Sequence, residues 1–135
     1  MSRAMSWCLL SLVCAASPSA AESYSVAVLQ ALDKVTARVT TLQAPVGETV
    51  RFGTLAIKAA VCDKRPPEET PESAAFLYIL EQRPEQAPVD VFRGWMFASS
   101  PGLSSMQHPV YDLWMVDCVN SSPSAEPRAS PGESP

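Results

Sequence analysis

The chain has 135 residues, 47% of them hydrophobic, and its 14 acidic and 10 basic side chains give a formal net charge of −4. This length fits one small domain, and the acidic balance with dispersed basic residues argues against nucleic acid as a partner. Beyond the N-terminal segment, no apolar stretch approaches the roughly 20 residues of a spanning helix, so we expect no membrane span.

Residues 1–21 have the features of a signal peptide. Arg3 precedes an uncharged, mostly apolar core over residues 7–16, which is too short to cross a bilayer. Small side chains predict cleavage after Ala21, with cleavage after Ala20 as the alternative. We therefore expect an exported, periplasmic protein whose mature chain begins at Glu22 and has 14 acidic and 9 basic residues.

The next segments change their hydrophobic period. Apolar side chains in residues 22–34 recur at near-helical spacing, which indicates one or two turns of helix or a loosely docked arm. The residues with this spacing are Val26, Leu29 and Leu32. Residues 35–40 alternate between apolar and polar side chains, with Val35 and Val39 on the apolar face, and predict a half-buried strand. A turn around Gly47 follows, and a second strand begins at Thr49.

In that second strand region the apolar face changes parity at Gly53, which predicts a bulge or a tight turn there. Residues 63–73 hold three prolines and four acids and are expected to form an exposed loop. The continuously apolar residues 76–80 indicate a strand covered on both faces or lying at a sheet junction.

The C-terminal part is expected to hold two more strands. In the first, four apolar residues share one parity, with Arg93 interrupting them. These residues are Val89, Val91, Trp95 and Phe97. A loop over residues 99–109 leads to a last strand over residues 110–118. Residues 119–135 are rich in proline and serine and are expected to be a disordered tail.

The fold expected from these elements is mainly β. Five or six short strands without a convincing long helix predict a small antiparallel sandwich or a partly open barrel. We expect a single domain over residues 22–118, with an ordered core from about residue 29. The two cysteines of the mature chain, Cys62 and Cys118, are expected to form a disulfide, because the chain is exported and CxxC spacing is absent.

Several strings in this order resemble family 2155 of the domains of unknown function, small exported proteins of Gram-negative bacteria. The strings are LDKVTARVTTL, PVGETVRFGTL, CDKRPPEETPESAAF, VFRGWMFASSPGL and HPVYDLWMVDC. The resemblance covers about residues 32–118, implies an envelope location and supports the pairing of Cys62 with Cys118. Because the function of that family is unassigned, it implies no catalytic role.

The only histidine, His108, suggests two specific chemistries. His108 with Asp112 and Ser99 or Ser100 suggests a hydrolytic triad, but no strained nucleophile turn surrounds either serine. The only histidine also suggests a copper site with nearby methionines, although methionines within strands more often fill a core. These methionines are Met96, Met106 and Met115. No catalytic residue, metal ligand or cofactor is assigned.

The aromatic side chains near the C-terminus are interpreted first as core and, if exposed, as a binding patch beside Arg93. The binding candidates are Trp95, Met106, His108, Tyr111, Asp112 and Trp114. The favoured function is a non-enzymatic module that binds an envelope protein, with a glycan as a possible ligand. The alternative is a hydrolase of cell-wall or glycan material that uses His108 and Asp112.

Overall fold

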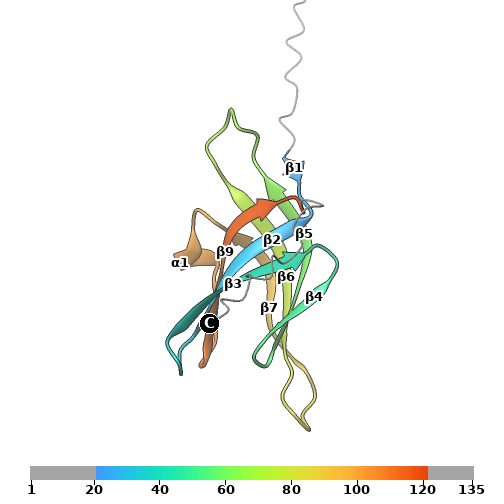
Figure 1. The fold of residues 1–135 in the computed structure, drawn as a ribbon, viewed down its shortest axis with the longest axis vertical. Coiled ribbons are helices and arrows are strands. Elements are labelled where there is room, and N and C mark those ends of the chain that lie inside the picture. The colour runs from blue at the N-terminus through green and yellow to red at the C-terminus, as the bar shows by residue number, and fades with distance from the viewer. Residues whose placement is uncertain (1–20, 122–135) are drawn as a thin grey trace, which may run out of the picture.

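The computed structural model describes residues 21–121 as two antiparallel sheets packed face to face. The smaller sheet has the order β3-β2-β9-β8, and the larger has the order β1-β5-β6-β7, with β4 also paired to β5. In Figure 1, β2 and β9 of the smaller sheet lie in front of β5, β6 and β7. The prediction of a mainly β sandwich is confirmed. Residues 1–20 of the predicted signal peptide and residues 122–135 of the predicted tail lie outside the described residues.

The strands of the larger sheet are β1 (Glu22–Ser23), β4 (Thr49–Phe52), β5 (Leu55–Lys64), β6 (Ser73–Glu81) and β7 (Val89–Phe97). The smaller sheet consists of β2 (Val26–Asp33), β3 (Arg38–Pro45), β8 (Met106–Gln107) and β9 (Tyr111–Val119). One short helix, α1 (Pro101–Ser104), lies between β7 and β8. Within the described part, no helix has the length and apolar character needed to span a bilayer.

The segment before the first predicted strand is itself a strand, so the interpretation of residues 22–34 as helix or arm was wrong. In β2 the buried residues are Val26, Ala27, Leu29 and Ala31. Two of these four residues are alanines. The alternation of buried and more exposed positions along β2 therefore depends in part on small side chains. The larger apolar side chains of this segment happen to lie at helical spacing.

The predicted strand over residues 35–40 begins later than expected. Residues 34–37 form a turn, in which the Asp33 carboxylate accepts hydrogen bonds from the Val35 and Thr36 amides. Ala37 has a φ of 55°, and Val35 and Val39 are exposed. An aspartate that caps the following amides stabilises a turn in place of a continuing strand. The parity change at Gly53 was predicted correctly, since a tight turn there joins β4 to β5.

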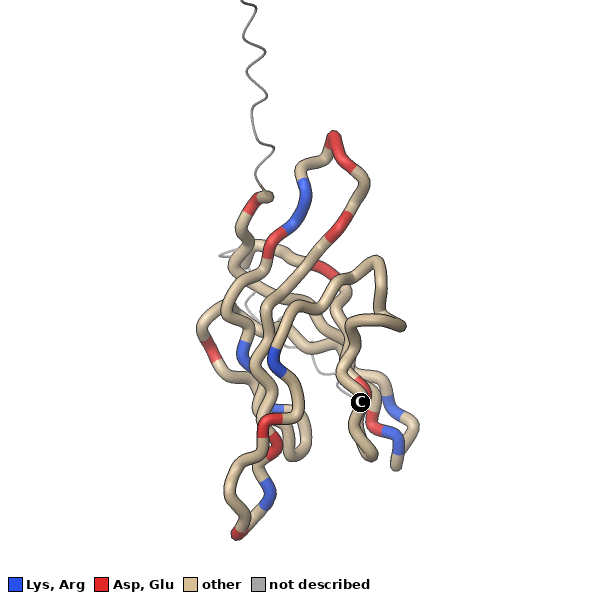
Figure 2. The backbone as a smooth tube through the Cα atoms, turned by 180° about the vertical axis from the view of Figure 1, so that it is seen from behind, with Lys and Arg blue, Asp and Glu red and all other residues tan. Residues whose placement is uncertain are grey.

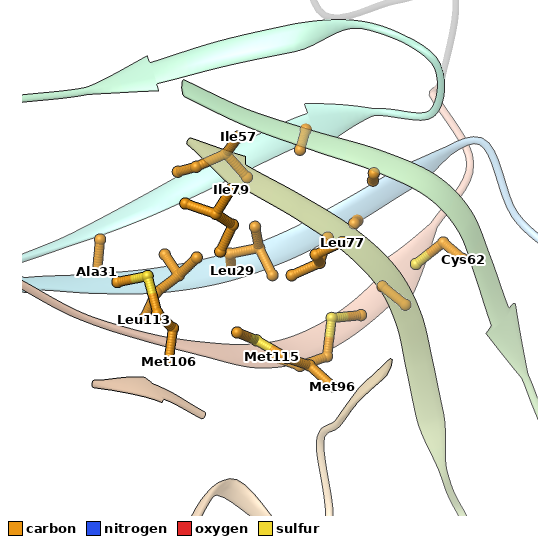
Figure 3. Close-up of a cluster of buried hydrophobic side chains, with 14 of the residues drawn as sticks. Leu29, Ala31, Ile57, Cys62, Leu77, Ile79, Met96, Met106, Leu113 and Met115 are labelled. Carbon is orange, nitrogen blue, oxygen red and sulfur yellow. The ribbon is translucent and has the colours of Figure 1, made fainter. Parts of the chain in front are cut away.

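The core lies between the two sheets and is built from aliphatic side chains and methionines (Figure 3). No aromatic side chain is among the largest fully buried ones of the described residues. Those large buried side chains are Leu29, Leu55, Ile57, Leu77, Ile79, Met96, Met106 and Leu113. The expectation that the C-terminal aromatics form the core was therefore wrong for Trp95 and Phe97, which are exposed, whereas Tyr111 packs against the margin of the core.

A disulfide between Cys62 on β5 and Cys118 on β9 joins the two sheets, with 5.8 Å between the Cα atoms. Both cysteines are buried, and each lies near the end of its strand. The predicted pairing is confirmed. The last strand continues one residue past Cys118, and beyond it Asn120 and Ser121 form hydrogen bonds with Ser25.

Candidate functional site: an aromatic row on the larger sheet

Four aromatic side chains lie on the outer face of β6 and β7, and we call them the aromatic row. They are Phe76, Tyr78, Trp95 and Phe97. Phe76 is directly opposite Trp95, and Ala74 is directly opposite Phe97, so these side chains share one face of the sheet. The neighbouring residues Leu77 and Met96 face the core and are fully buried. The buried parity of β7 is therefore the one that contains Met96, opposite to the one predicted.

The rings of the aromatic row contact one another in sequence. The ring centroids of Phe76 and Tyr78 are 5.3 Å apart with an interplanar angle of 62°, and those of Phe76 and Trp95 are 5.5 Å apart at 85°. Trp95 and Phe97 lie nearly parallel at 6.5 Å. Edge-to-face contacts of this kind hold aromatic side chains in place beyond the effect of burial alone. The aromatic row is therefore an ordered surface.

This surface is open to solvent. The exposed fractions are 42% for Trp95, 40% for Phe97 and 37% for Tyr78. A small soluble domain rarely leaves contiguous large apolar side chains exposed unless the patch binds something. Trp and Tyr are also the residue types enriched among the side chains that dominate binding energy at interfaces.

Basic side chains flank one end of the aromatic row. Arg93 on β7 and Lys58 on β5 are the two residues directly opposite Tyr78, one on each side. The Arg93 guanidinium lies 5.2 Å from the centroid of the Tyr78 ring, in the range of a cation–π contact. Seen from behind in Figure 2, the middle of this sheet is mostly uncharged with a few basic positions, whereas acidic positions lie mainly in loops and near strand ends.

The other end of the aromatic row borders a cavity of about 270 Å³. Trp95, Phe97 and Ala74 supply its apolar lining, and Lys64 and Arg65 supply basic groups. The acidic groups around it already have partners. Asp63 accepts a hydrogen bond from Ser23, and Glu72 accepts hydrogen bonds from the Ser99 amide and hydroxyl.

The strand that carries Trp95 is the last of its sheet, since no other described strand pairs with β7 beyond β6. At its C-terminal end, the Phe97 amide donates to Ser104 Oγ at 3.0 Å, and the Ser104 hydroxyl lies 3.3 Å from the Phe97 carbonyl oxygen. The helix α1 therefore covers the end of this edge. The rest of the edge, beside the aromatic row, is not covered by a described strand.

The remaining predicted binding candidates lie elsewhere. Met106 is buried in the core, as are Met96 and Met115, which confirms the expectation that the latter two fill the core. Trp114 is half-buried on β9, directly opposite Gln30, and its neighbours Leu113 and Met115 face the core. Its ring therefore lies on the outer face of the smaller sheet, on the opposite side of the molecule from Trp95.

His108 is also buried, so it does not offer the surface contact that was predicted. Its Nδ1 accepts a hydrogen bond from the Val110 amide at 3.1 Å, which places the ring proton on Nε2. Nε2 is 2.9 Å from Glu81 Oε2 and donates to it, and the Tyr111 ring stacks on the imidazole. Hydrogen bonds from His108 and Arg83 hold the pKa of Glu81 below its ordinary value.

The residues proposed for a hydrolytic triad are not brought together. Asp112 forms an ion pair with Lys34 at 2.7 Å, whereas His108 binds Glu81 at the C-terminal end of β6. The side chain of Ser99 binds Glu72, which directly precedes β6. The contact of Ser99 with Glu72 and the contact of His108 with Glu81 thus lie at opposite ends of β6. Because β6 has nine residues, they are on the order of 30 Å apart. Within residues 21–121, no three His, Cys, Asp or Glu side chains gather as metal ligands would.

Sequence reasoning identified Trp95 and missed Phe76, Tyr78 and Phe97 as parts of a binding surface. A signal was present in β7, because Arg93 has the same parity as Trp95 and Phe97. A core face does not normally hold a charged arginine side chain. Arg93 thus marked that parity as the one facing solvent.

The fold is a two-sheet antiparallel sandwich whose sheets are joined by one disulfide, with an ordered aromatic surface beside an open sheet edge. A family model described as "Uncharacterized protein conserved in bacteria (DUF2155)" matches residues 27–118. The chain belongs to this family, as the resemblance in its sequence implied.

One curated relative is "Uncharacterized protein RP359" of Rickettsia prowazekii (strain Madrid E). It is 31% identical over 97 residues, which cover 72% of this chain and 63% of the relative. The match thus spans just under two thirds of the relative's length. No solved structure matches the chain.

Proposed function

We propose that this protein is an exported, periplasmic module that binds another envelope protein through the aromatic row. The observation that carries this proposal is the ordered exposure of Tyr78, Trp95 and Phe97 on one face of a rigid sheet. Burying such rings against a partner removes a large apolar area from water at little cost in side-chain entropy.

A protein partner fits this surface better than a glycan does. The Phe76 ring stands at 62° and 85° to its two neighbours, so the aromatic row is not a flat platform on which sugar rings stack. The row also borders the edge of β7, whose backbone donors and acceptors suit another polypeptide. The nearby Arg93 adds a residue type that is common at the centre of protein interfaces.

Export is supported by two independent features. The sequence begins with an uncharged apolar core preceded by Arg3, as in secretion signals. The disulfide between Cys62 and Cys118 is of the kind that persists in an oxidising compartment. We expect the mature protein to begin at Glu22, and the intact mass of the native protein measures this directly. A mass that includes residues 1–21, or an acylated cysteine, would overturn this part of the proposal.

The binding function is tested by affinity capture from envelope extract with the full chain as bait. Trp95→Ala should weaken capture of a reproducible protein partner by about 30-fold, as expected for an aromatic anchor worth about 2 kcal/mol. Trp114→Ala, on the opposite face, is the matched control and should capture that partner normally. Equal capture by both variants would refute the proposal, as would recovery of a glycan as the ligand that depends on Trp95.

A further inference from the structure

We propose that the partner contributes an extended segment that pairs antiparallel with β7, with an apolar side chain opposite Trp95 and a carboxylate opposite Arg93. This inference rests on the proposed function and specifies how binding occurs and which chemistry the partner carries. It joins the open edge to the exposed rings of Trp95 and Phe97, because the edge and these two rings belong to β7.

The backbone groups of β7 alternate between its two edges. The Ala98 amide donates to the Ser73 carbonyl oxygen, on the β6 side, whereas the Phe97 amide points away from β6 to Ser104. By the alternation of an antiparallel ladder, the amides and carbonyls of Trp95 and Arg93 point to the same outer edge as those of Phe97. These two residues therefore present backbone donors and acceptors to an incoming strand.

Helix α1 sets the end of the available edge. Ser104 already occupies the amide of Phe97 and lies 3.3 Å from its carbonyl oxygen, so an added strand can pair beside Arg93 and Trp95 but not beyond. The pairing register is thereby limited to the stretch of β7 that carries the aromatic row and its basic end.

The side chains of β7 then specify the partner. In an antiparallel ladder, residues directly opposite each other have side chains on the same face, and opposite charges or aromatic pairs stabilise the ladder. Trp95 is 42% exposed, so an apolar or aromatic side chain on the partner strand would pack against its ring. The Arg93 side chain is 63% exposed, and its carboxylate neighbour Asp90 lies 3.9 Å away. The distance to Asp90 is long for an ion pair, so the Arg93 guanidinium beside the open edge is complementary to a carboxylate on the partner strand.

The expected order along the partner chain follows from the strand direction. Every pair among the described strands is antiparallel, and antiparallel pairing is the more stable per residue. In that direction the residue opposite Trp95 comes two positions before the residue opposite Arg93. The partner motif is therefore an apolar residue, any residue, and an acidic residue.

A second copy of this chain is a poor occupant of the edge. Symmetric pairing of β7 centred on Arg93 would place two arginines directly opposite each other, which destabilises a ladder. Symmetric pairing centred on Trp95 would place each Arg93 beside the Phe97 edge that Ser104 already occupies. Symmetric pairing centred on Gly94 would place Arg93 opposite Trp95. None of these three registers places a carboxylate opposite Arg93, so an acidic segment of another protein is the better fit.

The test uses the full chain and a capped seven-residue peptide of threonines, with tyrosine at the third position and glutamate at the fifth. Binding is followed by the amide NMR signals of β7. N-methylation of the peptide at its third or fifth residue removes a donor that faces β7 and should weaken binding at least 10-fold. N-methylation at the fourth residue, which faces away, should change binding less than 3-fold. Equal effects at all three positions would overturn strand addition, as would absence of binding at about 2 mM peptide.

A matched pair of variants tests the same edge from the protein side. Arg93→Ala removes the guanidinium and keeps the amide, whereas Arg93→Pro also removes the amide that faces the partner. Proline is tolerated at an edge whose N–H makes no ladder bond, and thermal unfolding of each variant checks the fold. Arg93→Pro should bind the peptide at least 5-fold more weakly than Arg93→Ala does. Equal binding by the two variants would contradict the proposal.

The outcomes separate this inference from the proposed function. If Trp95→Ala abolishes capture of the envelope partner while N-methylation has no positional effect, binding stands and strand addition is overturned. If capture survives Trp95→Ala, the proposed function itself fails. A dimer of the full chain in sedimentation that Arg93→Pro dissociates would identify a second copy as the occupant and overturn the acidic partner.

Discussion

The His108 imidazole donates from Nε2 to the Glu81 carboxylate at 2.9 Å and thereby joins the end of β6 in the larger sheet to the turn between β8 and β9 in the smaller sheet. The turn after β2 also contacts the backbone of this segment, because Lys34 Nζ donates a hydrogen bond to the His108 carbonyl oxygen at 2.8 Å. The hydrogen bond between His108 and Glu81 thus joins the two sheets near the start of β9. The disulfide between Cys62 and Cys118 joins them near the end of β9.

We expect His108→Ala to lower the free energy of unfolding by about 2 kcal/mol, because it removes a buried ring together with its hydrogen bonds to Glu81 Oε2 and the Val110 amide. Urea unfolding measures the change, and Val39→Ala, at an exposed position of β3, is the control. Partner capture by the folded variant should remain normal, because His108 is not part of the aromatic row. A stability equal to that of the parent chain would contradict the role of this contact.

The Glu81 carboxylate should make stability depend on pH in the acid range. Its pKa is lowered in the folded chain by hydrogen bonds from His108 and Arg83, so it stabilises the fold fully above its ordinary pKa of 4.5. This contribution is lost as the pH falls below that value through the lower folded pKa. Unfolding at a series of pH values between neutral and acid should show the loss, and Glu81→Gln should reduce its slope. An unchanged slope in Glu81→Gln would contradict the assignment.

The disulfide should contribute strongly to stability. Replacing both Cys62 and Cys118 with serine should lower the free energy of unfolding by about 3 kcal/mol, since the bond closes a long loop and joins the two sheets. Denaturant unfolding of the oxidised parent and the double variant gives the difference. Thiol labelling of the unfolded, unreduced parent should yield no adduct, and two labelled thiols per chain would refute the bond.

The tight turn at Gly53 is expected to tolerate no side chain. Gly53 has a φ of 56°, and a Cβ atom there would lie 2.6 Å from Cζ of Tyr111 and in contact with its hydroxyl. Gly53→Ala should therefore destabilise the fold by about 2 kcal/mol or more, combining strain with a steric clash. Gly47→Ala is the matched control, because Gly47 also has a positive φ, of 88°, but has open space around it. Equal costs for the two substitutions would show that the contact with Tyr111 is unimportant.

The sequence predicted the sandwich class, the turn at Gly53 and the disulfide because each depends on a local or covalent signal. A parity change beside a glycine limits the backbone to a bulge or turn, and two cysteines in an exported chain have few other uses. The strand β2 was missed because alanines carry its buried face, and small side chains give a weak periodic signal.

The orientation of β7 could not be read from apolar residues alone. Trp95 and Phe97 look like core residues by type, and only their place on the outside of the sheet shows otherwise. The hydrogen-bond partner of His108 could not be predicted from the sequence either. Asp112, four residues away, was the acidic residue considered as its partner. Its true partner, Glu81, is 27 residues away and is brought near only by packing of the two sheets.

The central claim is that the aromatic row is the face that binds a partner, and site-specific photocrosslinking in intact cells tests it most directly. A photoreactive phenylalanine analogue at position 78 lies within the row, and the same analogue at the exposed position 39 lies on the other sheet. We predict that the analogue at position 78 crosslinks to one reproducible envelope protein, and that the analogue at position 39 does not. Crosslinks to that protein from position 39 only, or from neither position, would contradict the account.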